Sequence, residues 1–141
     1  MKATSVVIAG AGGRGRITYA PYAKKFPEQM RLIAAADRIP ERLEEMRQEY
    51  GLEQDKCFSS VEEMFAQPRL ADMAFICTQD ADHVRHACLA LDKEYDVLLE
   101  KPVSADIAQC RQLLDKAEKL GRSVTVCHVL RYAPFYQKLK S

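Results

Sequence analysis

Short runs of apolar residues alternate along the chain with segments whose apolar positions recur every three or four residues. Continuous β-branched and aliphatic runs are typical of buried parallel strands, and the wider spacing is typical of helices that cover a sheet. The predicted strands lie at 6–8, 30–36, 57–58, 72–77, 95–99 and 123–127, and the predicted helices at 17–26, 40–50, 61–65, 84–91, 107–120 and 135–140. This alternation predicts an α/β fold with a doubly wound, mostly parallel sheet and helices on both faces.

Proline, glycine and capping residues set the expected helix ends. Pro21 interrupts the apolar spacing of the first helix and is expected to bend or shorten it. Ser104 is expected to cap the helix at 107–120, because its hydroxyl can accept a hydrogen bond from a free backbone N–H, and Gly121 is expected to terminate that helix.

The first predicted strand runs directly into a glycine-rich turn with the spacing G-x-G-x-x-G at Gly10, Gly12 and Gly15. In a dinucleotide-binding turn the first glycine permits the tight turn, the second lets the backbone approach a pyrophosphate, and the third lets the helix pack on the strand. The free N–H groups of that helix then face the phosphates. We therefore predict a Rossmann dinucleotide site, the alternative being an accidental glycine-rich turn. The expected cofactor contacts here are Gly10, Gly12, Gly13, Arg14 and Gly15.

Asp37 stands at the end of the second predicted strand, 22 residues after Gly15. A carboxylate at this place in a dinucleotide fold accepts hydrogen bonds from the adenosine ribose hydroxyls and repels a 2′-phosphate. The alternative is an aspartate that caps the following helix. Arg38 acts in the opposite sense, because a guanidinium can bind a 2′-phosphate. The pair favours NAD as the cofactor and leaves NADP open.

The strand predicted at 72–77 ends in Thr78 and Gln79, which become candidates to line the cofactor because ligands bind beyond the carboxyl ends of such strands. His83 and His86 follow one turn apart and could form half of a metal site. A third ligand at matching spacing is missing, so we expect a capping or surface role for them and no metal. Five cysteines without a C-x-x-C pair are expected to be reduced core thiols.

Glu100-Lys101-Pro102 ends the strand predicted at 95–99. A lysine there lies on the ligand side of the sheet, where its ammonium could bind a substrate hydroxyl and shift its proton equilibrium. Pro102 biases the Lys101 backbone to an extended form, which fixes where that ammonium points. The alternative is a Glu-Lys pair on the surface.

Composition narrows the function classes further. The 141 residues are 48% hydrophobic and 29% charged, which is ordinary for one globular domain. Lys and Arg number 21 against 20 for Asp and Glu, so no net positive field favours nucleic acid or an anionic membrane. The chain has no apolar run as long as a membrane span and no secretion signal, so we expect a cytoplasmic protein without membrane partners.

With these motifs in register, nearly the whole chain resembles the N-terminal dinucleotide-binding domain of the Gfo/Idh/MocA oxidoreductases. The motifs that carry the resemblance are the glycine turn, Asp37, Cys-Thr-Gln-Asp-Ala-Asp-His, Leu-Leu-Glu-Lys-Pro-Val-Ser and Arg-Tyr-Ala-Pro. The resemblance implies an enzyme that uses NAD or NADP to oxidise or reduce a hydroxyl on sugars, inositols or related polyols.

The resemblance also implies roles for single residues. Lys101 matches the lysine that contacts the reacting hydroxyl and assists catalysis, and Glu100 is expected to position the nicotinamide half. Thr78 and His83 match a Thr-Pro-x-x-x-His turn beside the cofactor, in which Gln79 replaces the usual proline. Arg131 matches an arginine near the nicotinamide.

In that family an α/β domain with an open sheet follows this one and supplies the substrate pocket and the oligomer interface. Residues 135–140 read as a helix cut short whose apolar side chains still need cover. We therefore expect a truncated protein, with 1–130 as the dinucleotide domain and 131–141 as the start of the connection. As given, it should bind a dinucleotide yet turn over little; the full-length protein should be a homo-oligomer. The alternatives are a non-catalytic dinucleotide sensor and a methyltransferase that binds S-adenosylmethionine.

Overall fold

A computed structural model describes residues 2–140, and its centre is a six-stranded sheet. The strands follow the order β3-β2-β1-β4-β5-β6, and all neighbouring strands are parallel. The strands are β1 (Thr4–Ala9), β2 (Met30–Ala36), β3 (Cys57–Phe58), β4 (Met73–Ile76), β5 (Asp96–Leu99) and β6 (Val124–Val126). This is the strand order of the doubly wound dinucleotide-binding fold, so the predicted fold class is confirmed. The order reverses between β1 and β4, which is where such folds form a ligand crevice.

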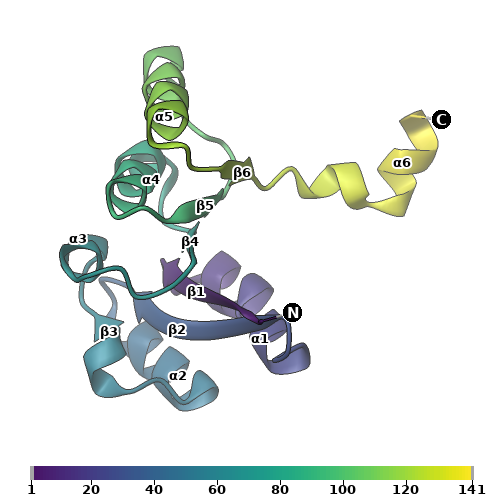
Figure 1. The fold of residues 1–141 in the computed structure, drawn as a ribbon. Helices are drawn as coiled ribbons and strands as arrows, with labels where there is room; N and C mark the ends of the chain where they lie inside the picture. Colours follow the sequence, from purple (N-terminus) through teal and green to yellow (C-terminus); the bar gives the residue numbers. More distant parts are fainter. Residues whose placement is uncertain (1, 141) are drawn as a thin grey trace.

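Helices cover both faces of the sheet (Figure 1). The α-helices are α1 (Pro21–Lys25), α2 (Pro40–Tyr50), α3 (Val61–Ala66), α4 (His83–Asp92), α5 (Ile107–Leu120) and α6 (Pro134–Lys140). Alternate side chains of β1 enter two cores. Val6 and Ile8 pack with Met46 of α2, whereas Val7 and Ala9 pack with residues of α3, α4 and α5. The sheet is thereby buried on both faces.

The helix after the glycine turn is a π-helix, η1 (Gly13–Tyr19), and α1 begins directly after it. The backbone N–H of Ala20 donates to the Gly15 carbonyl at 2.9 Å, which closes the wide π turn. Pro21 is the first residue of α1, where its missing N–H costs no hydrogen bond. The helix predicted at 17–26 is thus divided next to Pro21, which confirms that it is shortened there. Short 3₁₀ segments occur at η2 (Gln54–Lys56), η3 (Asp80–Asp82) and η4 (Val129–Tyr132).

The predicted cap of α5 is wrong by two residues. Asp106 is the N-cap, and its carboxylate accepts a hydrogen bond from the Ala108 N–H at 2.8 Å. The Ser104 hydroxyl instead accepts the Asp106 N–H at 3.0 Å and donates to Gln109, so Ser104 orders the loop before the cap. Gly121 ends the helix in a left-handed conformation, as predicted.

The C-terminal segment leaves the sheet after β6 and carries η4 and α6 away from the rest of the molecule (Figure 1). Its apolar side chains stay open to solvent: Tyr132 is 78% exposed and Leu139 is 70% exposed. Among the helices in residues 2–140, none combines the length and apolar character that crossing a membrane requires.

Candidate functional site

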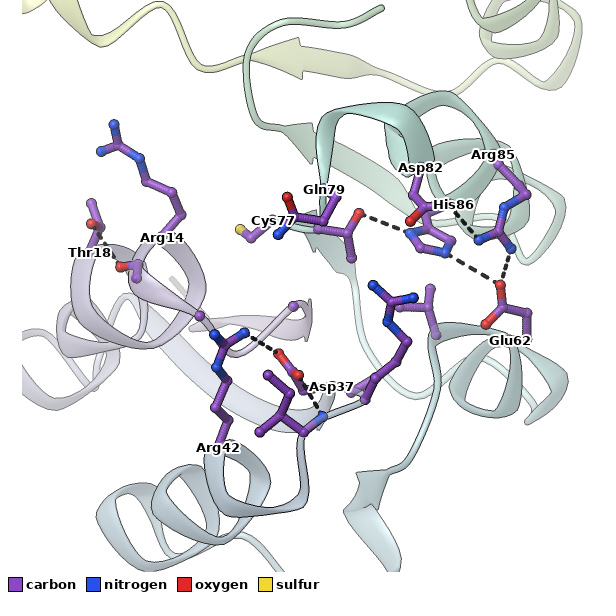
Figure 2. Close-up of a pocket in the computed structure, with 18 residues that line it drawn as sticks. Arg14, Thr18, Asp37, Arg42, Glu62, Cys77, Gln79, Asp82, Arg85 and His86 are labelled. Atoms are coloured by element: carbon purple, nitrogen blue, oxygen red, sulfur yellow. Dashed lines mark hydrogen bonds and ion pairs between the residues drawn. The ribbon is translucent and has the colours of Figure 1, made fainter.

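A cleft of about 680 Å³ opens where β1, β2 and β4 end (Figure 2). Eight of the residues that the sequence singled out line it: Gly10, Gly12, Gly13, Arg14, Asp37, Arg38, Thr78 and Gln79. They come from three loops that lie far apart in sequence. The parallel sheet brings these loops together because its strands all end at the same edge.

Two glycines of the turn sit where no other residue fits. Gly10 has φ +97°, and a Cβ built there would stand 2.5 Å from the Cys77 carbonyl oxygen at the end of β4. A Cβ on Gly15 would stand 2.0 Å from the Gly10 carbonyl oxygen and 2.8 Å from the Ile8 side chain. The predicted reasons for glycine at these positions, a tight turn and close helix–strand packing, agree with this geometry.

The other two glycines face open space. A Cβ on Gly13 would meet nothing within 4 Å, and one on Gly12 would meet only the Arg42 guanidinium, at 3.4 Å. Because both residues line the cleft and have no side chain, the backbone of Gly12 and Gly13 borders the cleft directly. Such a surface lets a phosphate approach the main chain closely, as a dinucleotide turn requires.

Asp37 joins the loop that follows β2 to the glycine turn that follows β1. Its carboxylate accepts the Ala11 N–H at 2.7 Å and the Ile39 N–H at 2.9 Å, and its side chain is only 8% exposed. Since Ile39 is the N-cap residue of α2, Asp37 braces the start of that helix as well as the glycine turn. A carboxylate has about four acceptor positions, and these two backbone hydrogen bonds do not use all of them. Ribose binding and helix bracing are therefore compatible here.

One arginine lies close to this carboxylate, and a second lines the same cleft. Arg42 of α2 places Nη1 3.7 Å from the Asp37 Oδ2 atom (Figure 2). Arg38 also lines the cleft. The sequence alone did not single out Arg42. The signal for it was the position of Arg42, in the first turn of a helix that starts beside the ribose acid.

The opposite wall carries an ion-pair network that the sequence reasoning also missed. Arg85 of α4 pairs with Glu62 of α3 and with Asp82, the latter at 2.8 Å (Figure 2). The Arg85 guanidinium lowers the pKa of both carboxylates. Glu62 Oε1 also lies 3.4 Å from Nε2 of His86. The ion pair between Glu62 of α3 and Arg85 of α4 joins two separate helices, so it depends on the tertiary fold and has no signal in the sequence spacing.

Of the capping or surface role predicted for the two histidines, the surface alternative is wrong, because both side chains are buried. His86 bonds the Thr78 hydroxyl through Nδ1 at 2.9 Å, and burial lowers the pKa of its imidazole. His83 faces the carbonyl oxygens of Pro102 at 2.6 Å and Thr78 at 3.1 Å. The start of α4 packs over the strand ends, so these rings hold the polar turns together. Within residues 2–140, no three His, Cys, Asp or Glu side chains gather as a metal site.

Glu100 forms a second buried group beyond the Arg14 end of the cleft. The Tyr19 phenol donates to Glu100 Oε1, the Lys101 N–H donates to Oε2 at 3.1 Å, and the Arg14 Nε atom lies 3.8 Å from Oε1. Burial and the neighbouring Cys127 and Glu100 side chains raise the pKa of Tyr19. Lys101 itself is exposed, and its bond to Pro102 is cis.

Some predicted site residues do not line the cleft. Gly15 and His83 are buried behind it, Glu100 lies beside it, and Lys101 and Arg131 point outward. Arg131 belongs to η4, in the segment that leaves the sheet. The cleft therefore gathers the predicted contacts for the adenosine and pyrophosphate, and not those predicted for the reacting hydroxyl.

Comparison with protein families gives one match over most of the chain. Residues 4–128 match a sequence model described as an oxidoreductase family with an NAD-binding Rossmann fold, Gfo/Idh/MocA. Trans-1,2-dihydrobenzene-1,2-diol dehydrogenase from Mus musculus is 29% identical over 109 residues, which cover 77% of this chain and 32% of that protein. The chain thus spans about a third of this curated relative.

Solved structures agree on the fold. The WlbA dehydrogenase from Bordetella pertussis, in complex with NADH and UDP-GlcNAcA, superposes with a TM-score of 0.88 at 20% identity, over 99% of this chain and 40% of that one. The scyllo-inositol dehydrogenase from Lactobacillus casei with bound NAD(H) and scyllo-inositol gives 0.87 at 24% identity, with the same coverage. At these identities the likeness concerns the fold alone.

Proposed function

Since the chain belongs to the Gfo/Idh/MocA oxidoreductase family, whose N-terminal domain has an NAD-binding Rossmann fold, we propose that it binds NAD(H) in a dehydrogenase acting on a sugar, inositol or related polyol. One observation carries the cofactor part: the bare glycine turn and the Asp37 carboxylate, hydrogen-bonded to each other, face one cleft at the strand ends. That combination suits a pyrophosphate next to a ribose diol. The substrate part is supported by what the relatives act on.

The residues present fit such a cofactor. Gly12 and Gly13 would receive the pyrophosphate, because both line the cleft without a side chain of their own and only the Arg42 guanidinium stands near the Gly12 Cβ position. Asp37 would hold the adenosine ribose, and Arg38 and Arg42 stand where they would decide between NAD and NADP. Thr78 and Gln79 would line the path toward the nicotinamide. When bound, the nicotinamide supplies or accepts the hydride.

Lys101 is the residue that we propose for catalysis. It follows β5 on the ligand edge of the sheet, and its exposed ammonium could hold a substrate hydroxyl and stabilise the negative charge on its oxygen as the proton leaves. Loss of hydride from the carbon that bears this oxygen then gives a carbonyl group. The His83 contact to the Pro102 carbonyl fixes the chain next to this lysine. Substrate recognition, Arg131 near the nicotinamide, oligomerisation through a second domain and a cytoplasmic location stay predictions.

Calorimetric titration with NAD, NADH, NADP and NADPH tests the cofactor site. The informative variant is Asp37→Asn, which keeps the side-chain volume, and Asp55→Asn on the exposed η2 segment is the matched control. We expect NAD to bind most tightly and Asp37→Asn to weaken it about tenfold, as for loss of a charged hydrogen-bond acceptor. Binding of none of the four would refute the cofactor proposal, and preference for the phosphorylated pair would shift the ribose role to Arg38 and Arg42.

A further inference from the structure

Among residues 2–140, the Thr78 hydroxyl has a single hydrogen-bond partner, the His86 ring. His86 Nδ1 lies 2.9 Å from the hydroxyl oxygen, and the other ring nitrogen, Nε2, lies 3.4 Å from Glu62 Oε1. All three side chains belong to residues that line the cleft. A neutral imidazole has one N–H and one lone pair. The direction of this series of contacts therefore depends on which ring nitrogen holds the proton.

Glu62 favours the proton on Nε2. Its Oε1 atom accepts a hydrogen bond from the Arg85 guanidinium, and this ion pair holds the pKa of the Glu62 carboxyl below its usual range. The carboxylate is therefore negative at neutral pH and can only accept hydrogen bonds. A lone pair on Nε2 of His86 would be repelled by that oxygen at 3.4 Å, whereas an N–H there is attracted to it (Figure 2).

His86 is buried and neutral, so its tautomer decides what Thr78 can do. Its side chain is 5% exposed, and burial, together with the Arg85 charge, lowers the pKa of the imidazole. The negative charges of Glu62 and Asp82 act in the opposite sense and are outweighed. With its proton on Nε2, the ring presents a lone pair at Nδ1. The Thr78 hydroxyl must then donate its one proton to His86.

The Thr78 hydroxyl consequently faces any ligand as an acceptor. After donating its proton it keeps two lone pairs. Thr78 is half-buried and borders the glycine turn, because its backbone nitrogen would stand 2.9 Å from a Cβ on Gly10. A dinucleotide on that turn would bring a pyrophosphate, which has acceptors only, and ribose hydroxyls on either side of it, which can donate. Of these groups, only the hydroxyls match an accepting Thr78.

We propose that Glu62 and His86 are positioning residues that hold the Thr78 hydroxyl as a hydrogen-bond acceptor, through which the cleft binds a ribose hydroxyl of the dinucleotide and not its phosphates. The ribose part rests on the proposed function, because it needs a dinucleotide in the cleft. The direction of the hydrogen bond from Thr78 to His86 does not, since it follows from the side chains alone. The two parts can therefore be tested separately.

The tautomer of His86 tests the first part. Nitrogen-15 NMR distinguishes a protonated from an unprotonated ring nitrogen, and the chain has three histidines, so His86→Gln identifies the signals of His86. At about pH 7.5, above the ordinary histidine pKa of about 6.5, we expect the proton on Nε2 with and without NAD⁺. In Glu62→Ala this preference should weaken. A proton on Nδ1 in the free chain, or its transfer to Nδ1 when NAD⁺ binds, would overturn the proposal.

Titration with NAD⁺ and ADP tests the second part. Thr78→Val keeps the side-chain shape without the hydroxyl, Thr78→Ser keeps the hydroxyl, and Thr125→Val at an exposed position of β6 is the matched control. We expect Thr78→Val to weaken NAD⁺ about fivefold, as for loss of one uncharged hydrogen bond, and the other two variants to stay within about twofold. ADP has only the adenosine ribose. An equal loss for ADP therefore assigns the hydroxyl to that ribose, and an unchanged ADP affinity assigns it to the second one.

Coupling between the variants separates positioning from packing. Glu62→Ala should also weaken NAD⁺, and in the Thr78→Val background it should cause no further loss, because it acts only through the hydroxyl. Additive losses, or an NAD⁺ affinity of Thr78→Val within about twofold of the unmodified chain, would overturn the positioning role and leave NAD⁺ binding intact. Failure of the unmodified chain to bind NAD⁺ would overturn the proposed function itself, and the tautomer of His86 would still decide the first part.

Discussion

Replacing Gly15 with alanine should destabilise the whole domain, and the structure gives the size of the effect. The new Cβ would lie 2.0 Å from the Gly10 carbonyl oxygen and 2.8 Å from Ile8. Non-bonded carbon and oxygen atoms need about 3.2 Å, so helix and strand must part by roughly 1 Å. Gly10 cannot yield easily, because its N–H is bonded to the Ala36 carbonyl at 2.8 Å. Overpacking of this kind costs about 3 kcal/mol.

Urea unfolding followed by circular dichroism measures this cost. With a slope of about 2 kcal/mol per molar urea, a loss of about 3 kcal/mol lowers the midpoint by about 1.5 M. Gly13→Ala is the matched control, because its Cβ meets nothing within 4 Å and alanine favours a helix by up to about 1 kcal/mol. The urea midpoint of Gly13→Ala should equal or exceed that of the unmodified chain. Because Gly13 lines the cleft, its added methyl group should weaken the binding of NAD. A Gly15→Ala midpoint within about 0.3 M of the unmodified chain would refute the reasoning.

Two further predictions concern His86 and Lys101. Burial lowers the pKa of His86, so its contribution to stability is present above the unfolded pKa of about 6.5 and is lost as the pH falls. His86→Gln should therefore flatten the dependence of the free energy of unfolding on pH between about pH 6.5 and 5, as urea unfolding at several pH values would measure. An unaltered slope in His86→Gln would contradict this. In a polypeptide that also carries a substrate domain, Lys101→Ala should lower kcat at least about a hundredfold while the NAD affinity of the domain stays within about twofold; full activity would remove Lys101 from catalysis.

The parts of the site that could be predicted are formed by residues that directly follow a predicted strand. The turn at 10–15 and Asp37 follow their strands directly, so the strand pattern alone placed them at one edge of the sheet. Arg42 and Glu62 were missed because their ion-pair partners, Asp37 and Arg85, lie on other elements. Arg85 was missed for the same reason in its pairing with Glu62, although its second partner, Asp82, lies only three residues earlier. A charge that pairs across two helices looks, in sequence, the same as one that faces water.

Helix ends and burial were predictable only in part. Ser104 and Asp106 are both good caps, and the choice between them depends on the extended backbone at Asp106, which the pattern does not contain. The burial of His83 and His86 depends on how α4 packs over the strand ends. The contact between Tyr19 and Glu100 joins residues 81 positions apart and had no local signal.

The hydrogen bonds of the sheet continue past the strand ends into the loops of the cleft. The Gly10 N–H reaches the Ala36 carbonyl and the Cys77 N–H reaches the Ala9 carbonyl, both at 2.8 Å. The loops are thus anchored by main-chain atoms, which do not change when side chains are exchanged. Arg38, Arg42 and Gln79 line the cleft over this fixed frame. A library that randomises these three positions should therefore change the cleft surface while the scaffold keeps its stability, and it would test whether they set the cofactor choice.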